Sequence, residues 1–181
     1  MNHHQNNWYT VTDPSELDTP ALLVYPERVQ HNIDAAIRLV GDPSRLRPHI
    51  KTHKTKEVAE LLMRSGVHQF KCATIAEAEL LGICKAKDVL LAYQPVGPKL
   101  KRFLSLIAHY PDTQYACLTD TIAAAQEIAL AAQQANIILP VYIDLNVGMN
   151  RTGIAPEDAW SLVDFCLQQP SIQLAGLHAY D

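Results

Sequence analysis

The stretch QYACLTDTIAAAQEIALAAQQANIILPVYIDLN, residues 114–146, shows the alternation of strand and helix that identifies the fold class. It opens with a short apolar run at 114–118 and ends with a second run at 140–146. The longer segment between them begins near Ile122 and is rich in alanine and glutamine. Short apolar runs predict buried strands, and the longer segment predicts a helix. The stretch therefore predicts a strand–helix–strand unit with parallel strands.

The same alternation continues outward from this unit in both directions. Further strands are predicted at 21–25, 45–51, 69–73, 88–93 and 172–180. The segments between them carry apolar residues at helical spacing, as from Val29 to Val40 and from Leu100 to Ile107.

Local signals agree with these helices. Proline stands where three helices are expected to begin, at Pro26, Pro98 and Pro156. Thr74 and Glu77 have the spacing of a capping box, which predicts another helix start.

Strict alternation of strand and helix predicts an α/β fold with a parallel sheet. An open doubly wound sheet and a (β/α)8 barrel both fit this pattern. We count six strands after the first helix, whereas a complete barrel needs eight and usually about 250 residues. The chain has 181 residues and stops just after a predicted strand. We therefore expect either an open sheet or a piece of a longer barrel.

The composition narrows the functional classes. The chain is 48% hydrophobic and 19% charged, with a net charge of -4, which gives no electrostatic case for nucleic-acid binding. No apolar run is long enough to span a membrane, and the first ten residues lack the apolar centre of a signal peptide. The four cysteines are scattered: Cys72, Cys84, Cys117 and Cys166. We expect reduced, buried thiols in a cytoplasmic protein.

The densest polar cluster is RPHIKTHK, residues 47–54. In an extended strand Arg47, His49 and Lys51 share one face, which suits an anionic ligand. A lysine crowded by Arg47 and partly removed from water loses its proton more easily, as an amine nucleophile requires. The alternatives are a solvated basic strand end and a metal site built from His49 and His53.

Two further clusters follow predicted strands. Asp144 is a candidate counter-ion for the basic strand face, and glycines at 148 and 153 allow a tight loop that directs Arg151 toward the strand ends. Tyr180 ends the last strand, where an aromatic ring can stack on a flat cofactor. Gln94 follows the strand at 88–93. A surface arginine and a core tyrosine are the alternatives. All these residues lie at carboxyl ends of strands, where parallel α/β folds place their active sites.

Together these clusters resemble the ordered motifs of a known enzyme family. LDTPALLV at 17–24, RPHIKTHK at 47–54 and ATIAEAE at 73–79 occur in the order found in the D-threonine aldolase/D-serine dehydratase family, and so do DVLLAYQ at 88–94, DLNVGMNRTG at 144–153 and GLHAY at 176–180. The chain thus resembles this family of pyridoxal 5′-phosphate (PLP) enzymes, which belong to the alanine racemase-like, fold type III class.

The resemblance implies a TIM-type PLP-binding barrel, present here as an incomplete barrel of about six parallel strands. Lys51 would be the catalytic residue and hold PLP as a Schiff base. Arg151 would be directed at the phenolic oxygen of the cofactor, and Tyr180 would pack against its ring. Gln94 would lie beside the cofactor or substrate, and His49 would line the pocket.

The resemblance also implies parts that this sequence does not contain. We expect residues 1–16 to be a polar extension and residues 17–181 to be a truncated barrel domain, inactive alone. The remaining strands, a phosphate loop, a β domain and the ligands of a divalent metal would follow in a longer chain, so no metal ligands are assigned here. The full-length protein would be a homodimer.

The implied activity is a lyase that acts on D-configured hydroxy amino acids, by aldol cleavage or by dehydration. An amino-acid racemase and a non-catalytic PLP-binding protein are the alternatives. An open-sheet binding module without PLP is a third possibility from another class.

Overall fold

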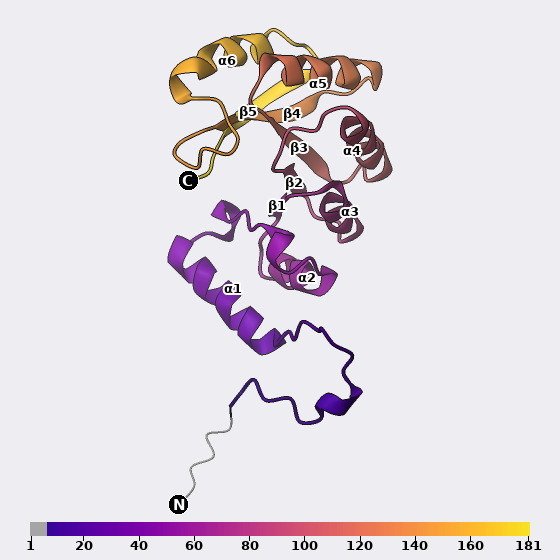
Figure 1. Ribbon diagram of the computed structural model, residues 1–181, viewed down its shortest axis with the longest axis vertical. Coiled ribbons are helices and arrows are strands. Elements are labelled where there is room, and N and C mark those ends of the chain that lie inside the picture. Colours follow the sequence, from indigo (N-terminus) through magenta and orange to yellow (C-terminus); the bar gives the residue numbers. More distant parts are fainter. Residues whose placement is uncertain (1–6) are drawn as a thin grey trace, which may run out of the picture.

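The computed structural model of the chain describes residues 7–181 (Figure 1). Its strands are β1 (Gln69–Cys72), β2 (Asp88–Leu91), β3 (Gln114–Thr119), β4 (Leu139–Leu145) and β5 (Ile172–Ala179). Its α-helices are α1 (Pro26–Val40), α2 (Lys56–Arg64), α3 (Ile75–Ile83), α4 (Pro98–His109), α5 (Ile122–Gln134) and α6 (Ala159–Leu167). Short 3-10 helices lie at Pro14–Glu16, Pro43–Arg45, Ile50–Thr52 and Pro156–Asp158.

The order of the strands identifies the type of sheet. They form one sheet in the order β1-β2-β3-β4-β5, and each neighbouring pair is parallel. A doubly wound sheet reverses its order at a switch point, whereas a barrel adds each strand beside the previous one. The chain follows the barrel path without reversal, so the structure confirms the incomplete α/β barrel and excludes the doubly wound alternative.

Two predicted strands are wrong. Residues 21–25 are mostly exposed and pair with no strand in the part of the chain that the structure describes. Residues 45–51 make only one bridge, between His49 and Lys71, before the chain turns into the 3-10 helix at Ile50. Pro48 has no N–H to donate to a strand ladder, although its carbonyl oxygen accepts from Lys71 N. The described sheet therefore has five strands and one bridge in place of about six strands.

The helix starts follow the sequence signals. Pro26 and Pro98 are the first residues of α1 and α4, and Pro156 opens the 3-10 turn that leads into α6. Thr74 Oγ1 accepts a hydrogen bond from Glu77 N at 3.1 Å. The Glu77 carboxylate accepts one from Ala73 N at 2.7 Å. The predicted cap is confirmed, and it fixes the turn between β1 and α3.

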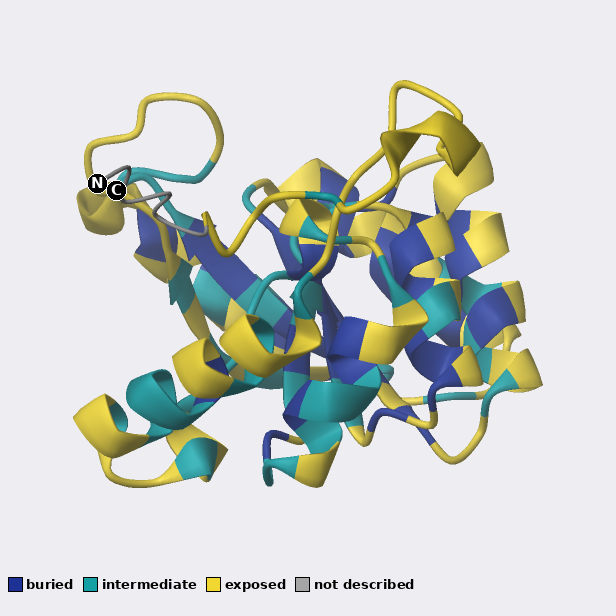
Figure 2. Cartoon of the chain, turned by 90° about the horizontal axis from the view of Figure 1, so that it is seen from below, coloured by how far each residue is buried: buried dark blue, intermediate teal, exposed yellow. Residues whose placement is uncertain are grey.

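The main core lies between the sheet and the helices, which follow one another along one side of it (Figure 1). Its largest fully buried side chains include Phe70, Phe103, Leu81, Ile128 and Ile143. The opposite face of the sheet carries a smaller cluster of Leu90, Ala116 and Leu118. Figure 2 shows buried residues gathered on the strands and inward helix faces, while the N-terminal segment is exposed. The sheet is thus packed against helices on one face, and its other face carries only a small apolar cluster.

Other expectations bear on the chain ends and on the environment. The predicted extension at 1–16 falls partly on residues 1–6, which lie outside the described residues, and its boundary stays a prediction. Among the helices of residues 7–181, none combines the length and apolar character required to cross a bilayer. The four cysteines are buried and free, as predicted.

Candidate active site

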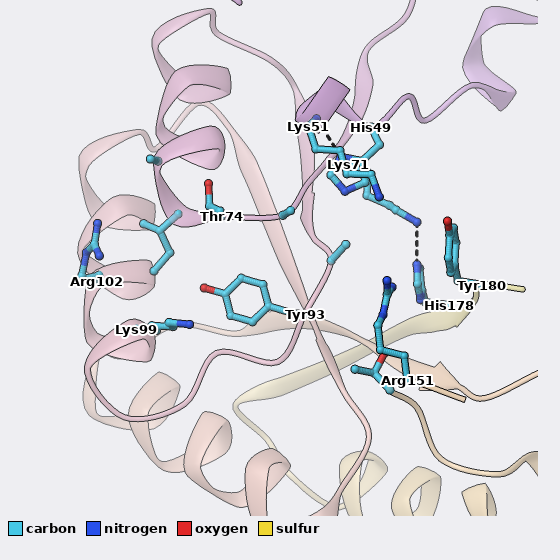
Figure 3. A pocket seen from close by; sticks show the side chains of 15 residues that line it. His49, Lys51, Lys71, Thr74, Tyr93, Lys99, Arg102, Arg151, His178 and Tyr180 are labelled. Atoms are coloured by element: carbon cyan, nitrogen blue, oxygen red, sulfur yellow. Dashed lines mark hydrogen bonds between the residues drawn. The ribbon is translucent and has the colours of Figure 1, made fainter. Parts of the chain in front are cut away.

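A cavity of about 600 Å³ opens at the carboxyl ends of the strands (Figure 3). Its lining comes from the segment at 49–51, the ends of β1, β2 and β5, the first turns of α3 and α4, and the loop after β4. Five of its residues are cationic: Lys51, Lys71, Lys99, Arg102 and Arg151. No aspartate or glutamate is among the lining residues. We call this site the cationic cavity.

Three predicted residues meet in the cationic cavity around one aromatic ring. Lys51 Nζ lies 5.8 Å from the centroid of the Tyr180 ring. The guanidinium carbon of Arg151 lies 5.4 Å from the same centroid. Figure 3 shows Arg151 and Tyr180 facing Lys51 across the cavity. An amine, a guanidinium and an aromatic ring are therefore available to one bound molecule.

His49 also lines the cavity, and the structure indicates its charge state. Its Nδ1 accepts a hydrogen bond from Lys51 N at 3.1 Å, so the proton of the neutral ring is on Nε2. Burial, together with the nearby charges of Lys51 and Lys71, lowers the pKa of His49 from 6.5 to about 4. His49 is thus a neutral imidazole that fixes the backbone beside Lys51.

The loop after β4 positions Arg151. Asn146 Oδ1 accepts hydrogen bonds from Gly148 N at 3.3 Å and Asn150 N at 3.0 Å. Gly153 has a φ of +99°, and a Cβ placed there would lie 2.6 Å from Asn146 N. Glycine is therefore required for the loop to fold back onto the end of β4, as the sequence predicted.

Arg47 lies elsewhere, which corrects the prediction that it shares a face with Lys51. Its guanidinium makes a two-pronged ion pair with Asp88 and also donates to Gln69 Oε1 at 2.9 Å. Asp88 and Gln69 are the first residues of β2 and β1, so this amino-end ion pair lies at the opposite edge of the sheet. The failure of 45–51 to form a strand separates Arg47 from Lys51.

Asp144 pairs with His178 and not with the basic segment at 47–51. His178 Nδ1 lies 2.5 Å from Asp144 Oδ1. Gln94 is not among the cavity-lining residues; its side-chain oxygen accepts from Asp120 N at 3.2 Å. It connects the ends of β2 and β3, and its contact with cofactor or substrate stays a prediction.

Sequence reasoning missed Lys71, which lines the cavity from β1. Its Nζ lies 2.9 Å from His178 Nε2. One signal could have identified it: Lys71 alternates with the buried Phe70 and Cys72, and a lysine inside a buried parallel strand is unusual without a partner.

The donor set of the cavity fits PLP. An aldehyde requires a primary amine, which Lys51 supplies. The anionic oxygens of the cofactor require cations, and its flat ring requires an aromatic or apolar face. Among residues 7–181 there is no group of three histidine, cysteine, aspartate or glutamate residues that could hold a metal ion.

Comparison with curated proteins finds similar PLP-enzyme relatives. The chain is 31% identical over 143 residues to D-threo-3-hydroxyaspartate dehydratase from Delftia sp. (strain HT23), covering 78% of this chain and 37% of that protein. It is 27% identical over 175 residues to D-threonine aldolase from Arthrobacter sp, covering 93% and 45%. It is 25% identical over 186 residues to alanine racemase from Chlorobaculum tepidum, covering 98% and 46%. The chain spans less than half the length of these relatives.

Solved structures agree. The crystal structure of D-threonine aldolase from Filomicrobium marinum matches with a TM-score of 0.80 and 28% identity, covering 88% of this chain and 43% of that one. D-threo-3-hydroxyaspartate dehydratase from Delftia sp. HT23 matches with a TM-score of 0.79 and 28% identity, covering 91% and 44%. The family profile described as "Alanine racemase, N-terminal domain" matches residues 24–181. The chain therefore belongs to the alanine racemase N-terminal domain family.

Proposed function

We propose that the full-length protein is a PLP-dependent lyase that acts on D-configured hydroxy amino acids, with Lys51 as the residue that holds the cofactor. One observation carries the proposal: Lys51, Arg151 and Tyr180 converge in a cavity that no carboxylate lines. When bound, PLP supplies an electron sink for negative charge that develops on the amino acid.

Each residue of the cavity has a role in this proposal. The amine of Lys51 would hold the cofactor through its aldehyde, and the same amine could accept or return a proton of the amino acid. Arg151 neutralises the phenolic oxygen of the cofactor, and Tyr180 packs against its ring. Neutral His49 orients the Lys51 backbone through its Nδ1 without adding charge.

Two of the relatives favour a lyase over the alternatives. D-threo-3-hydroxyaspartate dehydratase and D-threonine aldolase are both named for hydroxy amino acids of D configuration. Alanine racemases from Chlorobaculum tepidum and Treponema pallidum are also similar to the chain, at 25% and 28% identity, so racemisation is the second candidate. The proposal covers both cleavage and dehydration of the substrate.

The products distinguish these reactions. The full-length protein, loaded with PLP, would be given D-threonine, D-threo-3-hydroxyaspartate, D-serine and D-alanine separately. Aldol cleavage of D-threonine yields glycine and an aldehyde, whereas dehydration yields an oxo acid and ammonia. We expect one of these from a hydroxy amino acid. Racemisation of D-alanine alone would support the racemase, and bound PLP without turnover would support a non-catalytic protein.

We also propose that the protein works in the cytoplasm as a homodimer when full length. The four buried, unpaired cysteines support a reducing compartment. Light scattering of the full-length protein measures its mass, and a monomer would contradict the second part.

A further inference from the structure

A second amine occupies the cationic cavity. Lys71 Nζ lies 5.4 Å from the centroid of the Tyr180 ring, close to the 5.8 Å that separates Lys51 Nζ from it. Arg151 lies at the same ring from the loop after β4. An amino acid attached to a cofactor that lies between Lys51, Arg151 and Tyr180 would therefore be within reach of Lys71. The proposed function does not use this lysine.

Lys71 begins a chain of hydrogen bonds that leads away from the cavity. Its Nζ lies 2.9 Å from His178 Nε2 (Figure 3). His178 Nδ1 in turn lies 2.5 Å from Asp144 Oδ1. The Asp144 carboxylate can only accept, so Nδ1 carries the imidazole proton. Nε2 then has a free lone pair, and Lys71 donates to it. Asp144 is buried, and its hydrogen bond to Nδ1 holds the imidazole in this tautomer.

The surroundings of Lys71 favour loss of its proton. Burial lowers the pKa of Lys71, and the charges of Lys51 and Arg151 lower it further. The negative charge of Asp144 acts in the opposite direction and raises this pKa. The charged and titratable groups around Lys71 are Lys51 and His49 from the segment before α2, Arg47, Asp144 of β4, Arg151 and His178 of β5.

A purely structural ion pair does not explain this arrangement. The Lys71 side chain contacts an imidazole and an aromatic ring, and Asp144 is connected to it by way of His178. An amine, an imidazole and a carboxylate in sequence are instead the groups that a proton relay requires.

We propose that Lys71 is a second acid–base residue, which exchanges a proton with the hydroxyl group of the substrate while His178 and Asp144 hold that proton. In aldol cleavage the substrate O–H bond breaks and an N–H bond forms at Lys71 Nζ. The electron pair of the O–H bond forms the C=O bond of the departing aldehyde as the Cα–Cβ bond breaks, and the Cα–Cβ electron pair stays with the amino-acid product. Lys71 passes a proton to His178 Nε2, and Asp144 holds the imidazolium. The proton returns through Lys71 to the amino-acid product. This inference rests on the proposed function.

Two substitutions separate proton exchange from charge. Lys71→Met removes both, whereas Lys71→Arg keeps the charge but cannot accept a proton because arginine stays protonated. In the full-length protein loaded with PLP, we expect both variants to lower kcat for the hydroxy amino acid by about 10²-fold or more. KM should change much less. Borohydride should still tag Lys51 in both variants, which shows that they fold and hold the cofactor.

The outcomes distinguish this inference from the proposed function. If Lys71→Arg keeps the kcat of the unchanged protein, the charge of Lys71 is sufficient and the acid–base role is wrong. If either variant raises KM and leaves kcat intact, Lys71 binds substrate and exchanges no proton. If Lys51 is not tagged in the unchanged protein, or no hydroxy amino acid is turned over, the proposed function itself fails.

Discussion

The two ends of the sheet use the same kind of residue in opposite ways. At the amino ends of the strands, Arg47 is paired with the carboxylate of Asp88 and with Gln69. At the carboxyl ends, the cationic cavity holds Lys51, Arg151 and three other cations, and no carboxylate lines it. Paired charge within the protein stabilises the fold, whereas cations without lining carboxylates are available to an anionic ligand. Mutations at the two ends should therefore affect different measurements.

The largest effect is expected at Lys51. Because its amine is the proposed attachment point of the cofactor, Lys51→Ala should lower kcat/KM of the full-length protein by about 10³-fold or more. Lys101→Ala is the matched control, since this exposed lysine of α4 lies outside the lining of the cationic cavity. Similar activity losses in both variants would remove the distinction between the two positions.

Arg151 comes next. Arg151→Met should weaken PLP binding by about 10-fold to 10²-fold, because it removes a charge-assisted contact to the cofactor. The free energy of unfolding should change by less than about 0.5 kcal/mol, since Arg151 is exposed. PLP titration and urea denaturation measure the two effects. A large loss of stability with unchanged PLP affinity would reverse the assignment of the two ends.

Arg47 should show the opposite result. Arg47→Met leaves Asp88 without its partner, so we expect the free energy of unfolding to fall by about 1–3 kcal/mol. PLP attachment at Lys51 should be unchanged under conditions where the variant is folded. The comparison would break if Arg47→Met weakened PLP binding and left the urea midpoint unaltered.

The smallest effect concerns His49 and pH. The pKa of His49 is lowered to about 4 in the folded protein, chiefly by burial, so the unfolded chain binds a proton there at a higher pH than the folded chain does. Stability should therefore fall as the pH falls from 6.5 toward about 4, with no contribution from this group above that window. His49→Gln should reduce this loss by about 1–2 kcal/mol in urea denaturation at several pH values. Identical pH profiles would contradict the assignment.

Much of the fold could be predicted because its signals are local. The strands at 69–73, 88–93, 114–118, 140–146 and 172–180 were visible as apolar runs between helical segments. The prediction of a strand at 45–51 was wrong for a local and for a non-local reason. Pro48 lacks a donor, and a strand forms only where a neighbour pairs with it.

In the candidate site, too, residues beside local sequence signals could be predicted, and a long-range contact could not. Lys51, Arg151 and Tyr180 stand beside recognisable local signals, a basic cluster, a glycine loop and a strand end. The contact between Lys71 and His178 joins residues 107 positions apart. It arises from the placement of β1 and β5 around the inner face of the sheet, which no local pattern encodes.

Reductive trapping on the full-length protein tests whether Lys51 holds the cofactor. After incubation with PLP and borohydride, peptide mass spectrometry identifies which lysine carries the cofactor. We predict that the label is on Lys51, at the carboxyl edge of the sheet. A label on Lys71, Lys99 or a lysine outside the cationic cavity, or no label at all, would contradict the assignment of Lys51 as the residue that holds PLP.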